Sequence, residues 1–476
     1  MSQKLKYYLL LIVVILSVIL MILLPAAFML SAENPLDGIT TAPSTVPTGT
    51  TAATTTAPTD PTTVPTTTPP TTAAPTEPPV VKTGTFTLSA TGDMLMHSPL
   101  FNAAATGSGY DFSQLFRFFS DYVSNADYAV GNLETTLAGG DFVHDNGDVG
   151  YSGYPNFNCP DQIIDGMKDA GFDLVLTANN HSYDTRTVGL TRTPEIIADR
   201  GLSFLGTQMD AEEPDYLLVE RGGITLGLMC YTYEDNSDPN IKAPNGHTMK
   251  EADAPLINTF NYSELPAFYA ELEENMAEME DLGAEATVLF IHWGQEYHTE
   301  HNNTQSDMAQ KLCDLGIDVI IGGHPHVVQP VELLTGSEDK SHKTVCLYSM
   351  GNAVSNQRRE RMNKDTGHTE DGVLFSVTFA KYSDGTVILE SADLLPTWVF
   401  LGTSPVTGDW EYNILPLDDS VEDWYGALQL TDSMYDKCRE SYERTMEIVG
   451  SGMAEVEAYL AQNVADTEAL LGVENP

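Results

Sequence analysis

Between Thr85 and about Leu401, short hydrophobic runs alternate with longer amphipathic stretches. The runs have the length of buried strands, and the stretches repeat apolar positions with helical spacing. This alternation predicts an α/β fold in which helices cover a sheet on both sides. The pattern alone leaves open whether the strands form one parallel sheet or a sandwich of two. Strands are expected at 86–90, 128–130, 174–177, 203–205, 225–230, 287–291 and 319–321, helices at 112–123, 162–170, 193–200, 265–282 and 304–315, and a late β-hairpin at 375–380 and 387–392.

Two polar insertions lie within this alternating region, and helical patterns follow it. Residues 234–262 and 356–371 are polar insertions, which we expect to form loops near a functional site. Residues 402–476 include the helical patterns YDKCRESYERTMEIV and AEVEAYLAQNV. We therefore expect a main domain at 85–401 and a C-terminal helical extension at 402–476 that packs on it.

The N-terminal residues have the pattern of a membrane anchor. Residues 7–30 contain no charged side chain, and Lys4 and Lys6 precede them. An apolar run of about 20 residues spans a bilayer as a helix, and lysines before it favour a cytoplasmic N-terminus. A cleaved signal peptide is the alternative, but its apolar region is normally only about 7–15 residues long. We expect residues 1–6 in the cytoplasm and residues 7–30 as an uncleaved, single-pass signal anchor in the cell membrane.

Residues 31–84 are dominated by Thr, Pro and Ala, as in TTTAPTDPTTVPTTTPPTT. Such a segment has little apolar surface to bury, and its prolines favour an extended chain. We expect a disordered linker, or stalk, that holds the main domain outside the cytoplasm.

The composition is strongly acidic, with 22 Lys and Arg against 68 Asp and Glu and a formal net charge of −46. This balance argues against nucleic acid as a partner, because phosphate binding needs clustered basic side chains. It also discourages unassisted contact with a polyanionic polymer. The five cysteines show no CxxC spacing, so we expect mostly core thiols and neither a disulfide framework nor a zinc site.

Six hydrophobic runs end, on their C-terminal side, in residue types that commonly bind metals. Loops at the carboxyl ends of strands converge in α/β folds, so these residues are expected to meet at one site. The runs are TLSATGDMLMH (87–97), YAVGNLE (128–134), LVLTANNHSYD (174–184), VLFIHWGQEY (288–297), VIIGGHPHVVQ (319–329) and VCLYSMGN (345–352).

The residue types at these positions suit a hydrolytic centre with two divalent cations. Such a centre needs anionic oxygen between the cations, further nitrogen or oxygen ligands, and open positions for water and substrate. His181 is expected to be free of metal and either to donate a proton or to steady an anion, and Asp184 is expected to orient it. Carboxylate, amide and imidazole ligands accept Mn, Zn or Fe and do not separate them. The expected ligands are Asp93, Glu134, Asn180, His292, His324 and His326.

In this order, the motifs GDMLMH, GNLE, ANNHSYD, HWGQEY, GGHPHVVQ and YSMGN resemble the CapA family of capsule and poly-γ-glutamate synthesis proteins. That family is related to the calcineurin-like metallophosphoesterases. The resemblance covers roughly residues 85–400 and implies a four-layer α/β/β/α sandwich of metallophosphoesterase type.

The resemblance also implies roles for individual residues. Asp93 and His326 would bind one metal, and Glu134 would bridge to the other. Asn180, His292 and His324 would bind the second metal, with His181 as the catalytic histidine that binds none. The chain departs from the phosphoesterase pattern at the first motif, where Asp-x-His is replaced by Asp93 and His97 with three residues between them, so His97 is not expected to be a ligand.

Glu296, Gln329 and Asn352 lie in or beside these motifs. Glu296 and Gln329 are expected either to touch substrate or to hold loops by hydrogen bonds. Asn352 is expected to shape the site, because Gly351 before it permits a tight turn.

Three functions stay open at this point. The resemblance implies a membrane-anchored component of capsular polysaccharide or poly-γ-glutamate synthesis or export. Its partners would be an anionic envelope polymer or its precursor, and membrane polymer-synthase subunits. The ligand series equally suits a metal-dependent hydrolase, a phosphoesterase or amidase, that acts on envelope polymers. A non-catalytic, wall-associated binding module is the third alternative.

Overall fold

The computed structural model describes residues 79–236, 238, 241–362, 366–405, 407–418 and 428–473. The predicted cytoplasmic N-terminus (1–6), the predicted anchor (7–30) and residues 31–78 of the predicted linker lie outside this part of the chain. Within it, no helix combines the length and the apolar character that crossing a membrane requires. The described residues form a mixed α/β fold, as the alternation of strands and helices predicts.

The first sheet is organised around strand β1, which is buried from Leu88 to its end. β1 pairs in parallel with β4, so that Asp93 lies opposite Asn132 and Leu95 opposite Glu134. The order is β17-β16-β15-β1-β4-β5-β6, with the short β14 also paired to β1. The strands are β1 (Lys82–Leu95), β4 (Tyr128–Glu134), β5 (Leu174–Leu176), β6 (Ser203–Leu205), β14 (Asn352–Val354), β15 (Asp371–Tyr382), β16 (Val387–Thr403) and β17 (Trp410–Pro416).

The second sheet has the order β12-β13-β11-β10-β8-β7, and β9 pairs with β8. Its central strands β8, β10, β11 and β13 are parallel, so their carboxyl ends lie at the same edge. His292 is the last residue of β10, and Gly323 at the end of β11 lies opposite it. The strands are β7 (Tyr216–Arg221), β8 (Ile224–Tyr233), β9 (Thr259–Phe260), β10 (Ala286–His292), β11 (Val319–Gly323), β12 (Val331–Thr335) and β13 (Lys343–Leu347).

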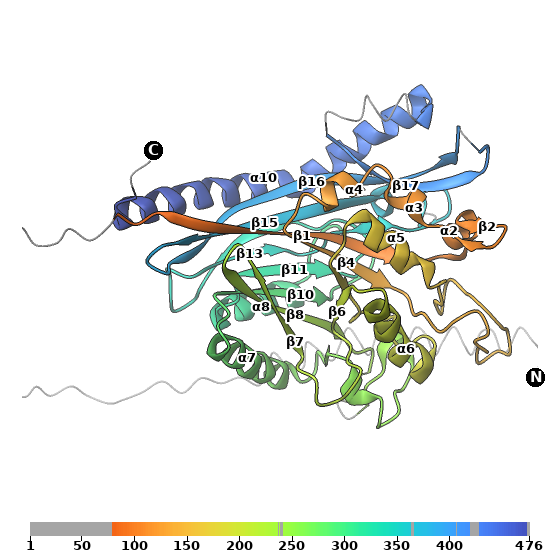
Figure 1. The fold of residues 1–476 in the computed structure, drawn as a ribbon, viewed down its shortest axis with the longest axis horizontal. Helices are drawn as coiled ribbons and strands as arrows, with labels where there is room; N and C mark the ends of the chain where they lie inside the picture. Colours follow the sequence, from red (N-terminus) through yellow and green to blue (C-terminus); the bar gives the residue numbers. More distant parts are fainter. Residues whose placement is uncertain are drawn as a thin grey trace, which may run out of the picture. The chain divides into compact units, whose positions relative to one another are not determined.

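The two sheets share one apolar core, in which Leu88 of β1 and Leu228 of β8 belong to the same buried cluster. Helices α2 to α6 pack with the other side of the first sheet, and α7 and α8 with the other side of the second (Figure 1). The remaining elements are α2 (Ser98–Ala103), α3 (Ser113–Phe116), α4 (Ser120–Val123), α5 (Gln162–Ala170), α6 (Arg186–Asp199), α7 (Leu265–Asp281), α8 (Asn303–Leu315), α10 (Asp432–Leu471), the 3-10 helices η1 (Pro244–Gly246), η2 (Ala254–Leu256) and η3 (His368–Glu370), and the hairpin of β2 (Ala105–Thr106) and β3 (Gly109–Tyr110).

Most predicted elements are found, but one predicted helix is divided into two. The helix expected at 112–123 is two short helices, α3 and α4. Phe116 and Phe119 pack into the core beside the first sheet, whereas Phe118 packs into a separate cluster with Trp398. Residues 117–119 form a turn between the two helices.

The C-terminal region contains one strand and one long helix. β17 continues the first sheet beyond residue 401, and α10 is a single helix of 40 residues that lies along β16 (Figure 1). α10 also passes β12 closely, since a Cβ on Gly452 would lie 1.8 Å from the carbonyl oxygen of Val331. The domain boundary at residue 401 stays a prediction.

Candidate metal centre

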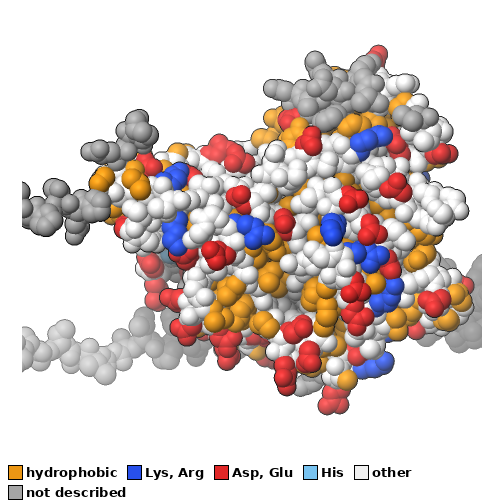
Figure 2. All heavy atoms as spheres, in the orientation of Figure 1, with side chains coloured by type: hydrophobic (Ala, Val, Ile, Leu, Met, Phe, Trp, Pro, Cys, Tyr) orange, Lys and Arg blue, Asp and Glu red, His pale blue; other side chains and the backbone are white. Residues whose placement is uncertain are grey.

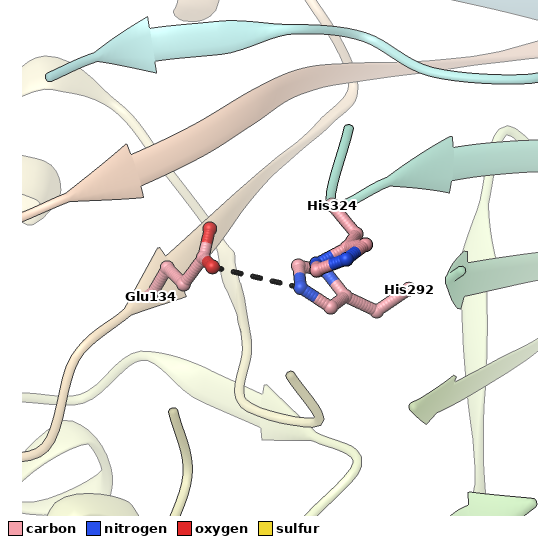
Figure 3. Close-up of side chains that lie close together, drawn as sticks. All are labelled: Glu134, His292 and His324. Atoms are coloured by element: carbon pink, nitrogen blue, oxygen red, sulfur yellow. Dashed lines mark ion pairs between the residues drawn. The ribbon is translucent and has the colours of Figure 1, made fainter. Parts of the chain in front are cut away.

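Glu134, the last residue of β4, is the centre of the site. Its side chain is fully buried, and neither of its carboxylate oxygens has a hydrogen-bond donor. Its Oε1 atom lies 3.6 Å from His292 Nε2, 3.7 Å from His326 Nε2 and 3.9 Å from His181 Nε2. Figure 3 shows its carboxylate facing His292, with His324 beside that ring. A buried carboxylate without donors is strongly unfavourable, unless protons on its neighbours or a cation neutralise it.

Two sets of side chains present atoms close enough to share an ion. We call Asp93, Glu134 and His326 the Asp93 group, and Glu134, His292 and His324 the His292 group. Within each group the ligand atoms all lie within 4.8 Å of one another, and every member is buried. Because Glu134 belongs to both groups, it is placed to bridge two cations. The donor-free carboxylate and the mixed oxygen and nitrogen donors fit a site for two divalent cations.

Asp93 is held firmly at the end of β1. Its Oδ1 accepts a hydrogen bond of 2.7 Å from Asn132 Nδ2. Its Oδ2 accepts from the backbone N–H of His324 at 3.2 Å and lies 3.1 Å from His326 Nδ1. Burial raises the pKa of Asp93, but the hydrogen bond and charge of His326 outweigh it, and the net shift is downward. Asp93 is therefore a preformed carboxylate that already orients one histidine of the centre.

The turn after β11 carries both His324 and His326 in the left-handed region of the backbone, at φ 96° and 56°. Non-glycine residues are rare there, and such strain is typical of functional sites. The turn is tied to a neighbouring loop by the N–H of Tyr297, which donates to the carbonyl of Pro325 at 2.8 Å. Nδ1 of His324 is buried without a hydrogen-bond partner, so this nitrogen is free to bind a cation.

The two histidines of this turn have opposite pKa shifts. Burial lowers the pKa of His324 well below its usual value, and the charges of His292 and His326 lower it further. Burial also lowers that of His326, but Glu134 and Asp93 outweigh it and raise its pKa to about 9. Without a cation, His326 therefore carries the proton that compensates the two carboxylates, while His324 is a neutral donor.

Asn180 and His181 follow β5 and face the same centre. Asn180 Oδ1 lies 2.9 Å from His292 Nε2, which puts the amide oxygen beside the His292 group. His181 Nδ1 lies 2.8 Å from Asp184 Oδ2, so its Nε2 faces Glu134. Burial lowers the pKa of His181, but Asp184 and Glu134 raise it more, and the net shift is upward. His181 is thus arranged as a proton donor oriented by Asp184.

Comparison with known proteins identifies the family of this chain. The family described as "Bacterial capsule synthesis protein PGA_cap" matches residues 87–357, more than half of the chain. The chain belongs to the PGA_cap family. The "Capsule biosynthesis protein CapA" of Bacillus anthracis is 24% identical over 330 residues, which cover 69% of this chain and 71% of that protein. The "PGA biosynthesis protein CapA" of Bacillus subtilis (strain 168) is 25% identical over 287 residues, covering 59% and 67%.

The PGA_cap match contains every predicted site residue and ends before β15 and α10. The predicted ligands Asp93, Glu134, His292, His324 and His326 all lie in the two groups, with Asn180 beside them. Their roles as ligands stay predictions. His97 belongs to neither group: its Nδ1 lies 3.1 Å from the carbonyl of Leu95, and its ring packs edge-on against Phe157.

The three residues predicted to contact substrate lie at different depths. Gln329 is fully buried, and its side chain bonds Gln305 and the backbone of the loop at residues 298–300. Asn352 is also fully buried, and its Nδ2 donates to the carbonyls of His326 and Thr369. Glu296 is partly exposed, and its Oε1 lies 4.0 Å from His326 Nε2. Substrate contact by these residues stays a prediction.

Two further residues beside the site, Asn245 and Tyr233, were not predicted from the sequence of this PGA_cap member. Asn245 in η1 donates from Nδ2 to Asp184 Oδ1 at 2.8 Å, and Phe157 N donates to Asp184 Oδ2 at 2.6 Å, so both carboxylate oxygens have a donor. The hydroxyl of Tyr233, the last residue of β8, lies 3.3 Å from His324 Nε2. Asn245 lies in the polar insertion 234–262, which was the available signal. The end of β8 was expected at residue 230, which left Tyr233 outside the strand.

Proposed function

We propose that this chain is a membrane-anchored, extracytoplasmic protein of capsular polysaccharide or poly-γ-glutamate synthesis or export. Its main domain would be a four-layer α/β/β/α metallophosphoesterase-like sandwich with a centre for two divalent cations. One observation carries the proposal of a metal centre: Glu134 is buried, has no donor, and lies between two groups of metal-type ligands. Membership of the PGA_cap family and relatives named for capsule and PGA biosynthesis support the biological role.

The charge of the chain suggests what the cations do for binding. The partner would be an anionic envelope polymer or its precursor, delivered by membrane polymer-synthase subunits. Figure 2 shows acidic side chains spread over one face, with Lys and Arg interspersed among them. With a formal net charge of −46, the protein would repel a polyanion. Two cations held at the centre would provide a local positive charge to which an anionic group can bind.

Binding of polymer with and without a chelator tests this proposal. Purified full-length protein in detergent would be loaded with Mn²⁺, analysed for metal, and titrated with poly-γ-glutamate. We expect bound metal in the wild type, less bound metal in His324→Ala, and polymer binding that EDTA abolishes. A wild-type protein without affinity for Mn²⁺ contradicts the metal centre. Equal polymer binding with and without EDTA contradicts the bridging role of the cations.

A metal-dependent hydrolase is the second candidate, because the His181–Asp184 pair has the arrangement of a proton donor and a carboxylate that orients it. Bound cations would supply positive charge and acidify a water molecule at the centre. Asp184 would hold the Nδ1–H of His181, and His181 Nε2 would donate its proton to a leaving group.

Turnover separates these two candidates. General acid catalysis contributes about 10²–10⁴-fold, so His181→Ala should lower hydrolysis of a phosphoester or amide by at least about 100-fold. Its metal content should stay unchanged. No hydrolysis by the metal-loaded wild type would favour assembly, export or a non-catalytic binding module.

A further inference from the structure

The two ligand groups are not equally complete. The His292 group has the amide oxygen of Asn180 beside it, so four side chains surround one cation position. The Asp93 group has three, and Glu134 is shared between the groups. His97, the nearest sequence candidate for a fourth donor, has its Nδ1 3.1 Å from the carbonyl of Leu95 and belongs to neither group. Among the described residues, the Asp93 group therefore has one side chain fewer than the His292 group.

The orientation of His326 shows where such a donor would lie. Its Nδ1 faces Asp93 Oδ2 at 3.1 Å, so its Nε2 points to the other side of the ring. On that side, Nε2 lies 3.7 Å from Glu134 Oε1 and 4.0 Å from Glu296 Oε1. Two carboxylates thus face the same nitrogen at similar distances. Histidine ligands commonly donate their second N–H to a carboxylate, as Nδ1 of His326 does to Asp93.

The loop that carries Glu296 is fixed to the turn that carries His326. Tyr297, the next residue, has a left-handed backbone at φ 66° and donates its N–H to the carbonyl of Pro325. Its hydroxyl accepts a hydrogen bond of 3.2 Å from Gln357 Nε2. This strained residue turns the chain so that Glu296 lies beside His326, on the side of the centre that reaches solvent, with 43% of its side chain exposed.

We propose that Glu296 is a ligand of the cation in the Asp93 group, where it takes the place that His97 does not fill. This inference rests on the proposed metal centre and concerns one carboxylate within it. Glu296 would be the fourth donor of this group, on its solvent side, beside Asp93, Glu134 and His326. Glu296 is then part of the centre itself, and its contact with substrate would occur only through the bound cation.

Metal stoichiometry tests the assignment without any assay of activity. Full-length protein in detergent would be stripped with EDTA and titrated with Mn²⁺ by calorimetry, with free and bound Mn²⁺ followed by electron paramagnetic resonance. We expect two sites in the wild type. In Glu296→Gln one site should weaken by at least about tenfold while the other keeps its affinity. Glu296→Asp, which keeps a carboxylate, should recover part of that loss.

Two control variants isolate the effect of the Glu296 carboxylate. Glu300→Gln removes an exposed carboxylate from the same loop, and should leave both affinities unchanged, so that a general change of charge is accounted for. His324→Ala should weaken the other site, so that the two losses are distinct. Two Mn²⁺ sites of wild-type affinity in Glu296→Gln overturn the inference and leave the proposed metal centre standing. A wild type that binds no Mn²⁺ overturns both.

Discussion

Two of the clusters of buried charged side chains in the described part of the chain differ in how their carboxylates are satisfied. In the central cluster, formed by the Asp93 and His292 groups, Glu134 is fully buried and neither oxygen has a donor. The second, which we call the C-terminal ion cluster, joins Glu370 and Asp371 to Arg358 and Arg444. Its two carboxylates are just as deeply buried, with exposures of 0% and 1%.

Every carboxylate oxygen of the C-terminal ion cluster has a donor. Asp371 accepts two hydrogen bonds from Arg444 and one of 2.6 Å from Ser441. Glu370 accepts from the N–H of Arg359 at 2.9 Å and from Trp398 Nε1 at 3.2 Å, and pairs with Arg358 at 3.2 Å. Burial alone therefore does not mark a ligand site. The donor-free carboxylate of Glu134 distinguishes the central cluster, because a structural ion cluster provides its own donors.

The largest effect should come from breaking the C-terminal ion cluster. Arg444→Met leaves the buried Asp371 carboxylate without its two charged hydrogen bonds, and removal of one partner of a buried pair costs about 3 kcal/mol. We expect this loss in the free energy of unfolding, measured in urea, to be the same with Mn²⁺ and with EDTA. Arg439→Met, at an exposed position of α10, is the matched control and should change stability little.

The next effect separates the central cluster from the C-terminal one. Mn²⁺ at about 100 times its dissociation constant should stabilise the wild type by at least about 2.7 kcal/mol, because the cation binds only the folded state. Glu134→Gln should lose this gain, since both ligand groups share that carboxylate. In EDTA the same variant should be at least as stable as the wild type, because it no longer buries a charge without donors. A strong destabilisation of Glu134→Gln in EDTA would show that the central cluster is structural too.

The smallest predicted effect concerns His97, which we assign as a neutral neighbour of the central cluster and not as one of its members. Burial lowers the pKa of His97 to about 4, and the charges of His326, His181 and Arg361 also lower it, against the hydrogen bond to Leu95. A histidine whose pKa is lower in the folded state than in the unfolded state is protonated first in the unfolded state. Its contribution to the free energy of unfolding is therefore largest above a pH of about 6.5 and is lost as the pH falls towards 4.

When the pH falls from 7.5 to 5.5, the protonation of His97 should therefore reduce the free energy of unfolding by about 1.3 kcal/mol. His97→Gln should remove that part of the pH dependence, as measured by urea unfolding in EDTA at both pH values. An equal pH dependence in the variant and the wild type would contradict the assignment of His97 as a neutral neighbour of the centre.

The parts predictable from sequence are those set by local patterns. Helix α5 and strand β6 have the predicted bounds, because period and flanking residues define them within a few positions. The metal-type residues at six strand ends were predicted for a similar reason, since parallel strands bring their carboxyl ends together.

The rest depends on contacts between distant segments. Asn245 reaches Asp184 across 61 residues and Arg444 reaches Asp371 across 73, and no local period signals either partnership. The packing of the neighbouring Phe118 and Phe119 into two different clusters likewise depends on distant segments. Which side of His326 faces Glu296 depends on the backbone conformation of Tyr297 and is visible only in three dimensions.

The hydrogen bond between Asp93 and His326 joins residues that are 233 positions apart, and that between Asn180 and His292 joins residues 112 apart. Loops of this length close late in folding, because their entropy is lost before any contact compensates it. An incomplete polypeptide would present these side chains only as scattered weak donors. Metal binding should therefore coincide with the final packing of the two sheets against each other, so that only a fully folded domain binds the ion.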